Sequence, residues 1–387
     1  MPSARRPLVA RAAVLGLLVA LVASASAPFG DFGLEADAAT ERLGALDLRG
    51  FLASAPAYGG SLLLRAPFAL AGHLTGARSV EARYLWLALP CLLAAAWLAA
   101  TAASVLAAAG RGRAEVGATL LLLGANPLTI EALGQGHAEE LLVGALGVAA
   151  VLAGLRDRPV LAGVLLGAAI GSKGWALLAV VPVLWSLGDV RARAHALASA
   201  GVVALALGLP LLLGAPGAVR SAASIATSGG DIVQAWSAWT LMGVGREQLL
   251  PPPVWLQALT HPLALGAGIA LPLLALPRRR RSDAFLVFSL ALLTRCALDT
   301  WTTLYYLLPA TFALAAHESL NLRRAPVGAA ALTMVALAAE GSPQPLAGTA
   351  TALALLGGAA LCFALLIRAP GGVAQVASPA IASTARA

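Results

Sequence analysis

The chain has 387 residues, of which 59% are hydrophobic and only 11% are charged. Soluble domains have about a quarter of their residues charged, so this composition excludes a soluble globular protein. The formal net charge is +8, but the basic residues occur in small groups at regular intervals. This pattern is typical of cytoplasmic loops and argues against nucleic-acid binding. Cys91, Cys296 and Cys362 fit no disulfide or metal-binding spacing.

Apolar runs rich in Ala, Leu and Gly follow one another along the whole chain. A helix needs about 20 apolar residues to cross a bilayer, and this composition favours helices over barrel strands. We predict an all-α integral membrane protein, a polytopic bundle of about twelve transmembrane helices within one membrane domain, residues 1–368. The predicted spans are residues 8–27, 82–109, 114–125, 138–155, 159–170, 174–187, 195–213, 261–276, 284–297, 304–316, 325–339 and 346–367.

Both ends of the chain have distinct compositions. Residues 8–27 also fit a cleavable signal peptide, because small residues follow the apolar core. The run is long enough to span a bilayer, however, and cleavage would leave the next loop untethered, so we expect a span. Residues 369–387 are predicted to be a disordered cytoplasmic tail.

The distribution of charge predicts the topology. With the N-terminus inside, one side receives nearly all of the basic loop residues and the other receives the acidic ones. The basic group comprises Arg5, Arg6, Arg11, Arg111, Arg113, Arg156, Arg158, Arg191, Arg193, Arg278, Arg279, Arg280, Arg281, Arg323, Arg324 and Arg368. The acidic group comprises the first loop, Glu81, Glu131, Glu139, Glu140, Asp231, Glu247 and Glu340. We therefore predict a multi-pass protein of the inner (plasma) membrane with both termini in the cytoplasm.

Residues 28–81 are predicted to form an acidic outer loop and a surface helix. The stretch 61–74, SLLLRAPFALAGHL, carries Arg65 and His73, and counting it as a span would invert every later loop. We therefore expect an amphipathic helix on the outer face. A second long outer loop is predicted at residues 214–260, where Trp236 and Trp239 could stack on a ligand or belong to a plain connection.

The first outer loop holds a dense group of carboxylates, five of the eighteen in the chain: Asp31, Glu35, Asp37, Glu41 and Asp47. A carboxylate within hydrogen-bond reach of a hydroxyl can remove its proton during attack. Asp31 follows the first predicted span most closely, and Glu35 and Asp37 lie about one helical turn or more further on. The alternative is an acidic loop that is simply solvated.

Two basic residues interrupt apolar runs. Lys173 is the only lysine among 26 Lys and Arg residues, and it stands where two short helices could meet. A charge at membrane depth is rarely left without a partner or a water-filled cavity, so Lys173 is a candidate phosphate ligand, or else it snorkels to the interface. Arg295 and Asp299 stand four apart and can pair on one helix face, which favours an anion site. Tyr305 and Tyr306 follow, where aromatic residues are also common as interfacial anchors.

Another outer loop offers weaker signals. It contains Asn126 and, further on, His137 between carboxylates. This spacing matches no strong metal-ligand motif, and nothing in the sequence demands a metal.

Several of these motifs resemble the GT-C superfamily of multi-span glycosyltransferases, and within it the bacterial branch that uses polyprenyl-phosphate-mannose. The similar features span most of residues 8–320. They are Glu35-Ala-Asp37, similar to a modified Asp-x-Asp element; Ala57-Tyr-Gly-Gly-Ser61; Asn126-Pro127 with Gly134-Gln135-Gly136-His137; and Ala162-Gly163 leading through Gly167 to Ser172-Lys173-Gly174-Trp175.

The resemblance implies an inverting hexosyltransferase, with mannose the expected sugar. The donor would be a polyprenyl-phosphate sugar in the outer leaflet, the acceptor an envelope glycan or glycolipid, and no cofactor or metal is implied. An aspartate of the first outer loop would act as base, and Lys173 and Arg295 would stabilise the leaving phosphate. The aspartate followed by Val-Tyr that is usual in the family is missing here, so Asp31 and Asp37 remain alternatives, in that order. Glu35, Asn126, His137, Asp299, Tyr305 and Tyr306 complete the expected substrate-binding set.

Two other functions fit the same composition. A transporter or flippase for lipid-linked sugars would also place broken helices and buried charges near the bilayer midplane. A non-catalytic membrane protein of the cell envelope would need no site at all.

Overall fold

The computed structural model describes residues 30–227, 237–242, 254–275, 280–340 and 346–368. Regular structure in this part of the chain is entirely helical, with no strand. The predicted all-α class is therefore confirmed for the described residues. The predicted first span, 8–27, and the predicted tail, 369–387, lie outside them.

The predicted spans from 82–109 onward coincide with helices, although α13 and α15 begin several residues earlier than expected. The helices are α7 Val80–Ala108, α8 Arg113–Gly124, α10 Glu139–Leu155, α11 Pro159–Ser172, η1 Gly174–Ala179 with α12 Val180–Ser186, α13 Val190–Gly214, α15 Val254–Leu274, α16 Ala284–Leu298, η5 Leu304–Leu307 with α17 Leu308–Ala316, α18 Val327–Glu340 and α19 Leu346–Arg368. Some of these pieces are much shorter than a full membrane crossing.

Four described helical stretches are long and apolar enough to cross a membrane. They are Val80–Ala108, Arg113–Gly134, Val190–Gly214 and Thr349–Arg368. The second of these joins α8 to α9, Pro127–Gly134, across Asn126. Length and composition therefore support an integral membrane protein with at least these candidate spans.

Residues 28–81 were predicted to form an acidic loop and a surface helix, but the described part from residue 30 to residue 74 folds into five short helices. These are α2 Gly30–Glu35, α3 Asp37–Gly44, α4 Leu48–Ser54, α5 Gly59–Leu64 and α6 Ala66–Leu74. Phe32, Ala36, Ala39 and Leu43 recur at helical spacing and are all buried. The Phe32 ring lies 4.9 Å from the ring of Tyr84 on α7. The carboxylates between these apolar positions remain at the surface of a packed unit.

The predicted surface helix 61–74 is helical but not continuous. It divides at Arg65 into α5 and α6, and the Arg65 side chain points into the protein, where it is only 3% exposed. Gly59, Gly60, Ser61 and Leu62 are buried as well. The prediction of one amphipathic surface helix is therefore wrong for α5, because Arg65 has a buried ionic partner described below.

The second predicted outer loop, 214–260, is also partly helical. It contains α14 Pro216–Thr227, η2 Ala238–Met242 and the first turns of α15. Trp239 donates from Nε1 to the carbonyl of Leu298 at 2.7 Å, so it joins this segment to the end of α16. Trp236 lies outside the described residues.

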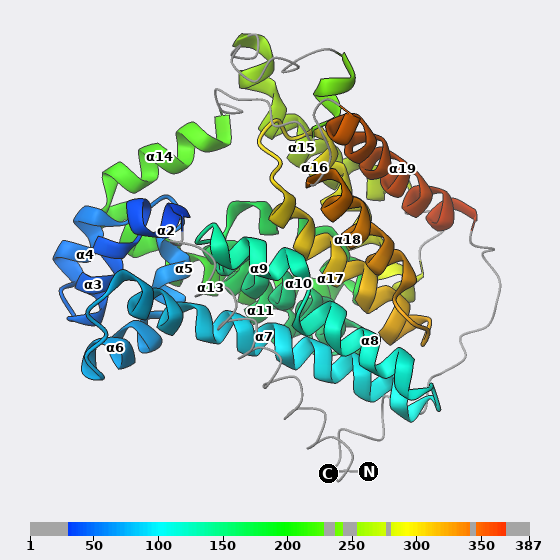
Figure 1. Cartoon of the computed structure of the whole chain (residues 1–387), viewed down its shortest axis with the longest axis horizontal. Helices are drawn as coiled ribbons and strands as arrows, with labels where there is room; N and C mark the ends of the chain where they lie inside the picture. The colour runs from blue at the N-terminus through cyan, green and yellow to red at the C-terminus, as the bar shows by residue number, and fades with distance from the viewer. Residues whose placement is uncertain (1–29, 228–236, 243–253, 276–279, 341–345, 369–387) are drawn as a thin grey trace.

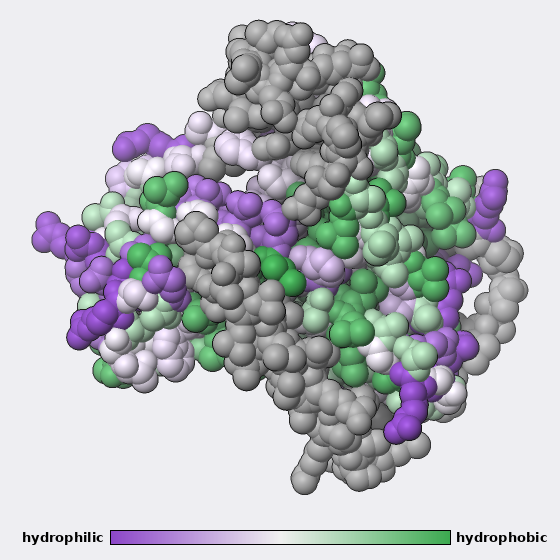
Figure 2. Space-filling view, in the orientation of Figure 1, coloured by the Kyte–Doolittle hydropathy of each residue, from purple (hydrophilic) through white to green (hydrophobic). Residues whose placement is uncertain are grey.

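The described loops gather at two ends of the helices. In Figure 1, α2 to α6 lie together on the left, and α7 runs from them toward the turn that leads into α8. At that turn, Arg111 Nε donates to the carbonyl of Arg323 at 2.6 Å. Arg281 Nη2 lies 2.6 Å from Asp157 Oδ1, which joins two further basic loops. Figure 2 shows hydrophilic surface over the helices on the left and again at the lower right, with hydrophobic surface between.

Candidate functional site

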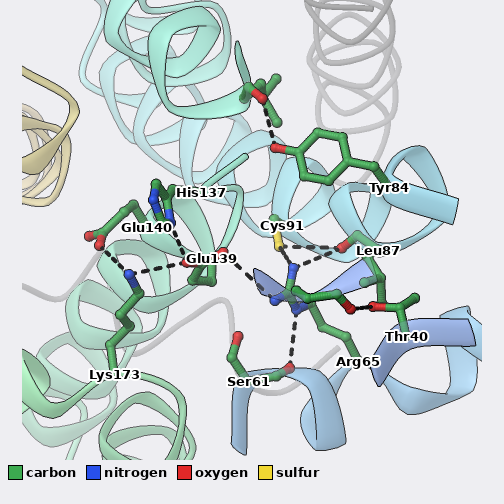
Figure 3. A network of polar contacts seen from close by, with 12 residues as sticks. Thr40, Ser61, Arg65, Tyr84, Leu87, Cys91, His137, Glu139, Glu140 and Lys173 are labelled. Atoms are coloured by element: carbon green, nitrogen blue, oxygen red, sulfur yellow. Dashed lines mark hydrogen bonds and ion pairs between the residues drawn. The ribbon is translucent and has the colours of Figure 1, made fainter. Parts of the chain in front are cut away.

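Two buried carboxylates at the start of α10 form the centre of the candidate site. Lys173, the residue after α11, lies between them: its Nζ is 3.1 Å from Glu139 Oε1 and 3.1 Å from Glu140 Oε1 (Figure 3). The side chains of Glu139 and Glu140 are at most 1% exposed. The positive end of the α10 dipole favours carboxylates at this position. The lone lysine of the sequence thus has carboxylate partners inside the protein, as a buried charge requires.

Arg65 approaches Glu139 from the other side. Its Nη2 lies 3.7 Å from Glu139 Oε2, its Nε donates to the carbonyl of Ser61 at 3.1 Å, and its Nη1 donates to the carbonyl of Leu87 at 3.4 Å (Figure 3). Two cations therefore face two carboxylates, which keeps this buried group neutral overall. Such compensation is needed because an unpaired buried charge is strongly destabilising.

His137 connects this buried group to Asp31 at the surface. Its Nδ1 lies 3.0 Å from Glu139 Oε1 and its Nε2 lies 3.0 Å from Asp31 Oδ2. The His137 side chain is 9% exposed, whereas that of Asp31 is 49% exposed. The network thus begins at an accessible carboxylate and ends at fully buried ones.

The backbone holds Asp31 against the same loop. The Asp31 N–H donates to the carbonyl of Gln135 at 3.1 Å. Gly30 has a φ of +29°, and a Cβ there would lie 2.9 Å from the Gln135 oxygen. Glycine therefore permits the close approach that brings Asp31 to His137.

The two carboxylates control the protonation of His137. Burial and the positive charge of Lys173 lower the pKa of His137, but the hydrogen bonds that the ring makes to Glu139 and Asp31, together with the charge of Glu139, outweigh them. The net result is a pKa above the ordinary value. The imidazolium form is therefore favoured.

Aromatic rings link His137 to Arg295. The His137 ring stacks on Tyr305 with centroids 5.1 Å apart, and Tyr305 meets Tyr306 edge to face at 4.9 Å. The Arg295 guanidinium lies 4.4 Å from the Tyr306 centroid and 5.9 Å from that of Trp175. Trp175 donates from Nε1 to Glu140 Oε1 at 3.4 Å. Asp31, Lys173 and Arg295, predicted separately, thus belong to one connected set.

Arg295 retains hydrogen-bonding capacity. Its Nε lies 3.5 Å from Asp299 Oδ2, while Asp299 Oδ1 accepts from the Trp301 N–H at 3.0 Å and lies 3.3 Å from His261 Nδ1. Its Nη1 is buried and has no hydrogen-bond partner among the described residues. A buried donor without a partner is costly, and an anionic ligand would satisfy it.

Other predicted residues lie outside this set. Asp37 accepts two hydrogen bonds from Arg83, at 2.7 Å from Nε and 2.6 Å from Nη2, so it fastens α3 to α7. Asn126 is buried, caps α9 by accepting from the Leu128 N–H at 2.9 Å, and donates to Thr333 Oγ1 at 3.1 Å. Glu35 is exposed, and its charge adds to the burial that raises the pKa of Tyr58.

Several residues of the site were missed as candidates from the sequence. Arg65, Tyr58 and Trp175 were not proposed, and Glu139 and Glu140 were treated only as loop carboxylates. Lys173 lies 5.2 Å from the centroid of the Tyr58 ring. The sequence did contain a signal for Arg65. It is a single arginine within an apolar run, and such a charge, like that of Lys173, predicts a buried partner.

No group of three or more His, Cys, Asp and Glu side chains suited to a metal ion occurs within the described ranges. No protein-family model matches the chain, and no curated protein or solved structure matches it. Assignment of a function therefore depends on the geometry of the site and on the sequence motifs.

Proposed function

We propose that the protein is a membrane glycosyltransferase that transfers a hexose, with mannose the first choice, from a polyprenyl-phosphate donor to an envelope glycan or glycolipid. The observation that carries this proposal is the accessible Asp31 carboxylate, joined through His137, Tyr305 and Tyr306 to the buried Arg295, which has an unused donor. The Asp31 carboxylate can accept a proton from a hydroxyl, and the Arg295 guanidinium can bind a phosphate. No metal or cofactor enters the reaction.

In the proposed reaction, the acceptor hydroxyl oxygen attacks the anomeric carbon and a new glycosidic bond forms. The bond between that carbon and the phosphate oxygen breaks, and its electron pair stays on the phosphate. Asp31 takes the hydroxyl proton. The configuration of the sugar inverts because attack and departure occur on opposite faces.

Arg295 is the preferred phosphate ligand in this scheme. Its Nη1 is buried without a partner, whereas the Lys173 ammonium lies between Glu139 and Glu140. A guanidinium aimed at the departing oxygen would stabilise the developing negative charge. Lys173 then acts mainly by fixing the two carboxylates.

The proposal includes a topology of about twelve spans with the site at the outer face. Glu139 begins α10 and Lys173 follows α11, so these site residues lie at the opposite end of the helix pair from the turn that carries Arg156 and Arg158. The grouped arginines come from the other end, which suits the cytoplasmic side of an inner membrane.

The decisive experiment is transfer by the reconstituted protein. Liposomes would contain the wild type, Asp31→Asn or Asp37→Asn with radiolabelled polyprenyl-phosphate-mannose and an acceptor membrane fraction. Asp31→Asn should reduce transfer about 100-fold or more, because it removes the base. Asp37→Asn should retain transfer, because Asp37 is already paired with Arg83.

Three outcomes would contradict this assignment. Loss of transfer in Asp37→Asn with full activity in Asp31→Asn would move the base to Asp37. If wild type transfers no label but moves the labelled lipid between leaflets, the protein is a flippase. Absence of both activities would favour a non-catalytic envelope protein.

A further inference from the structure

His137 lies between two carboxylates that can only accept hydrogen bonds when ionised. Its Nε2 and Nδ1 are each 3.0 Å from a carboxylate oxygen, of Asp31 and of Glu139. Neutral imidazole has one N–H donor and one acceptor nitrogen, so it cannot satisfy both carboxylates. Imidazolium has a donor on each nitrogen and satisfies both.

The charges around the ring favour the same form. Asp31, Glu139 and Glu140 contribute three negative charges, and Lys173 and Arg65 contribute two positive ones. An imidazolium at His137 makes the sum zero, and a neutral ring leaves one negative charge uncompensated. Because much of the group is buried, the neutral total is favoured.

Every element packed against the ring contributes to this environment. Asp31 comes from α2, Glu139 from α10, Lys173 follows α11, Tyr58 precedes α5 and Tyr305 belongs to η5. The Tyr58 ring lies 6.2 Å from His137, and Tyr305 lies 5.1 Å away. Of these groups only Lys173 opposes a positive charge on the ring, and its ammonium is neutralised by two carboxylates.

We propose that His137 is a positioning residue, an imidazolium that bonds Asp31 Oδ2 and Glu139 Oε1 together and so orients the Asp31 carboxylate toward a substrate hydroxyl. The effect of this bridge on catalysis rests on the proposed function, whereas the bridge itself does not. The proton that Asp31 receives does not pass to the ring, which already carries both protons. It leaves to solvent from Asp31, whose side chain is half exposed.

This role gives a defined pH dependence. Because the folded pKa of His137 is raised, the bridge is complete below the ordinary value of about 6.5 and is lost as the pH rises through the raised value. Transfer should therefore decline on the alkaline side as the ring loses its second proton.

The direct test is an NMR titration of isotope-labelled histidine in the full-length protein in lipid nanodiscs. The chain has only five histidines, and His137→Gln identifies the signal of His137. We expect His137 to titrate above about 6.5, and Asp31→Asn should lower its pKa measurably. A titration at or below the ordinary value, or one that Asp31→Asn leaves unchanged, overturns the proposal whether or not the protein transfers sugar.

Enzyme kinetics then distinguish a positioning role of His137 from a purely structural role in folding. The Gln side chain in His137→Gln can still donate toward Asp31 but cannot bridge to Glu139 or carry a charge. We expect a fall of about 100-fold in kcat, little change in the KM for the donor lipid, and loss of the alkaline limb of the pH profile. His195→Gln, at an exposed position on α13, is the matched control and should behave as wild type. Unchanged kcat and an unchanged alkaline limb in His137→Gln would exclude the positioning role.

Discussion

Glu139 is the residue on which most of the buried charges depend. It contacts Lys173, Arg65 and His137 together. Glu139→Gln should destabilise the protein by about 3–5 kcal/mol, because it leaves buried positive charge without its carboxylate. Thermal denaturation in detergent would measure the loss.

A second substitution tests whether charge balance is the cause. Arg65 is the cation left without a carboxylate, since Lys173 still has Glu140. Arg65→Met added to Glu139→Gln should recover part of the lost stability, whereas no recovery would contradict the charge argument. Arg42→Gln is the matched control, because the pair of Arg42 with Asp47 is exposed and should contribute little.

Part of the site could be predicted, because an isolated charge beside or within an apolar run is unusual enough to be noticed at a single position. A lone lysine in an apolar run and a carboxylate just after a predicted span singled out Lys173 and Asp31, which the structure brings into one network through His137 and Glu139. The links between them could not be inferred, because Arg65 and Glu139 are brought together only by tertiary packing. The sequence ranked Asp31 above Asp37 only by its distance from the first predicted span, whereas the structure pairs Asp31 with His137 and Asp37 with Arg83.

At the scale of helices, α11 and α13 pack through glycines. Gly163, Gly167 and Gly171 recur every four residues on α11, and each faces atoms of α13. A Cβ at Gly167 would meet the carbonyl oxygen of Ala200, which is backbone and cannot move aside alone. Small residues at this spacing let two membrane helices approach closely.

Gly167→Leu should therefore separate α11 from α13 and displace Lys173 at the end of α11. We expect a loss of several kcal/mol in stability from overpacking, measured as a lower denaturation temperature. Gly201→Leu on α13 is the control, because a Cβ there meets nothing within 4 Å. Equal effects of the two substitutions would show that close packing is not the reason for glycine at Gly167.

Helix positions were predicted well because apolar runs and charged breaks mark them directly, as α16 and α19 illustrate. The helices α2 to α4 were missed because their apolar residues are few and their polar content suggested a loop. Their structure depends on packing against α7, with Phe32 on Tyr84, which no local pattern reveals.

For the molecule as a whole, the proposed membrane orientation rests on the separation of the two polar ends. The three native cysteines are buried, so the wild type should react little with an impermeant thiol reagent. Single cysteines at exposed positions then report the sides: Glu41→Cys and Gly217→Cys at one end, Gly112→Cys and Arg191→Cys at the other.

In right-side-out membrane vesicles, Glu41→Cys and Gly217→Cys should react with the impermeant reagent because both lie on the proposed outer face. Gly112→Cys and Arg191→Cys should react only after the membrane is permeabilised, because arginine-rich loops remain in the cytoplasm. The pair at 41 and 217 is the most informative, since six predicted spans, from 82–109 to 195–213, separate them. Reversal of the two groups would invert the topology and move Asp31 away from a lipid-linked donor in the outer leaflet, and reaction of all four positions in sealed vesicles would contradict the predicted alternation of spans.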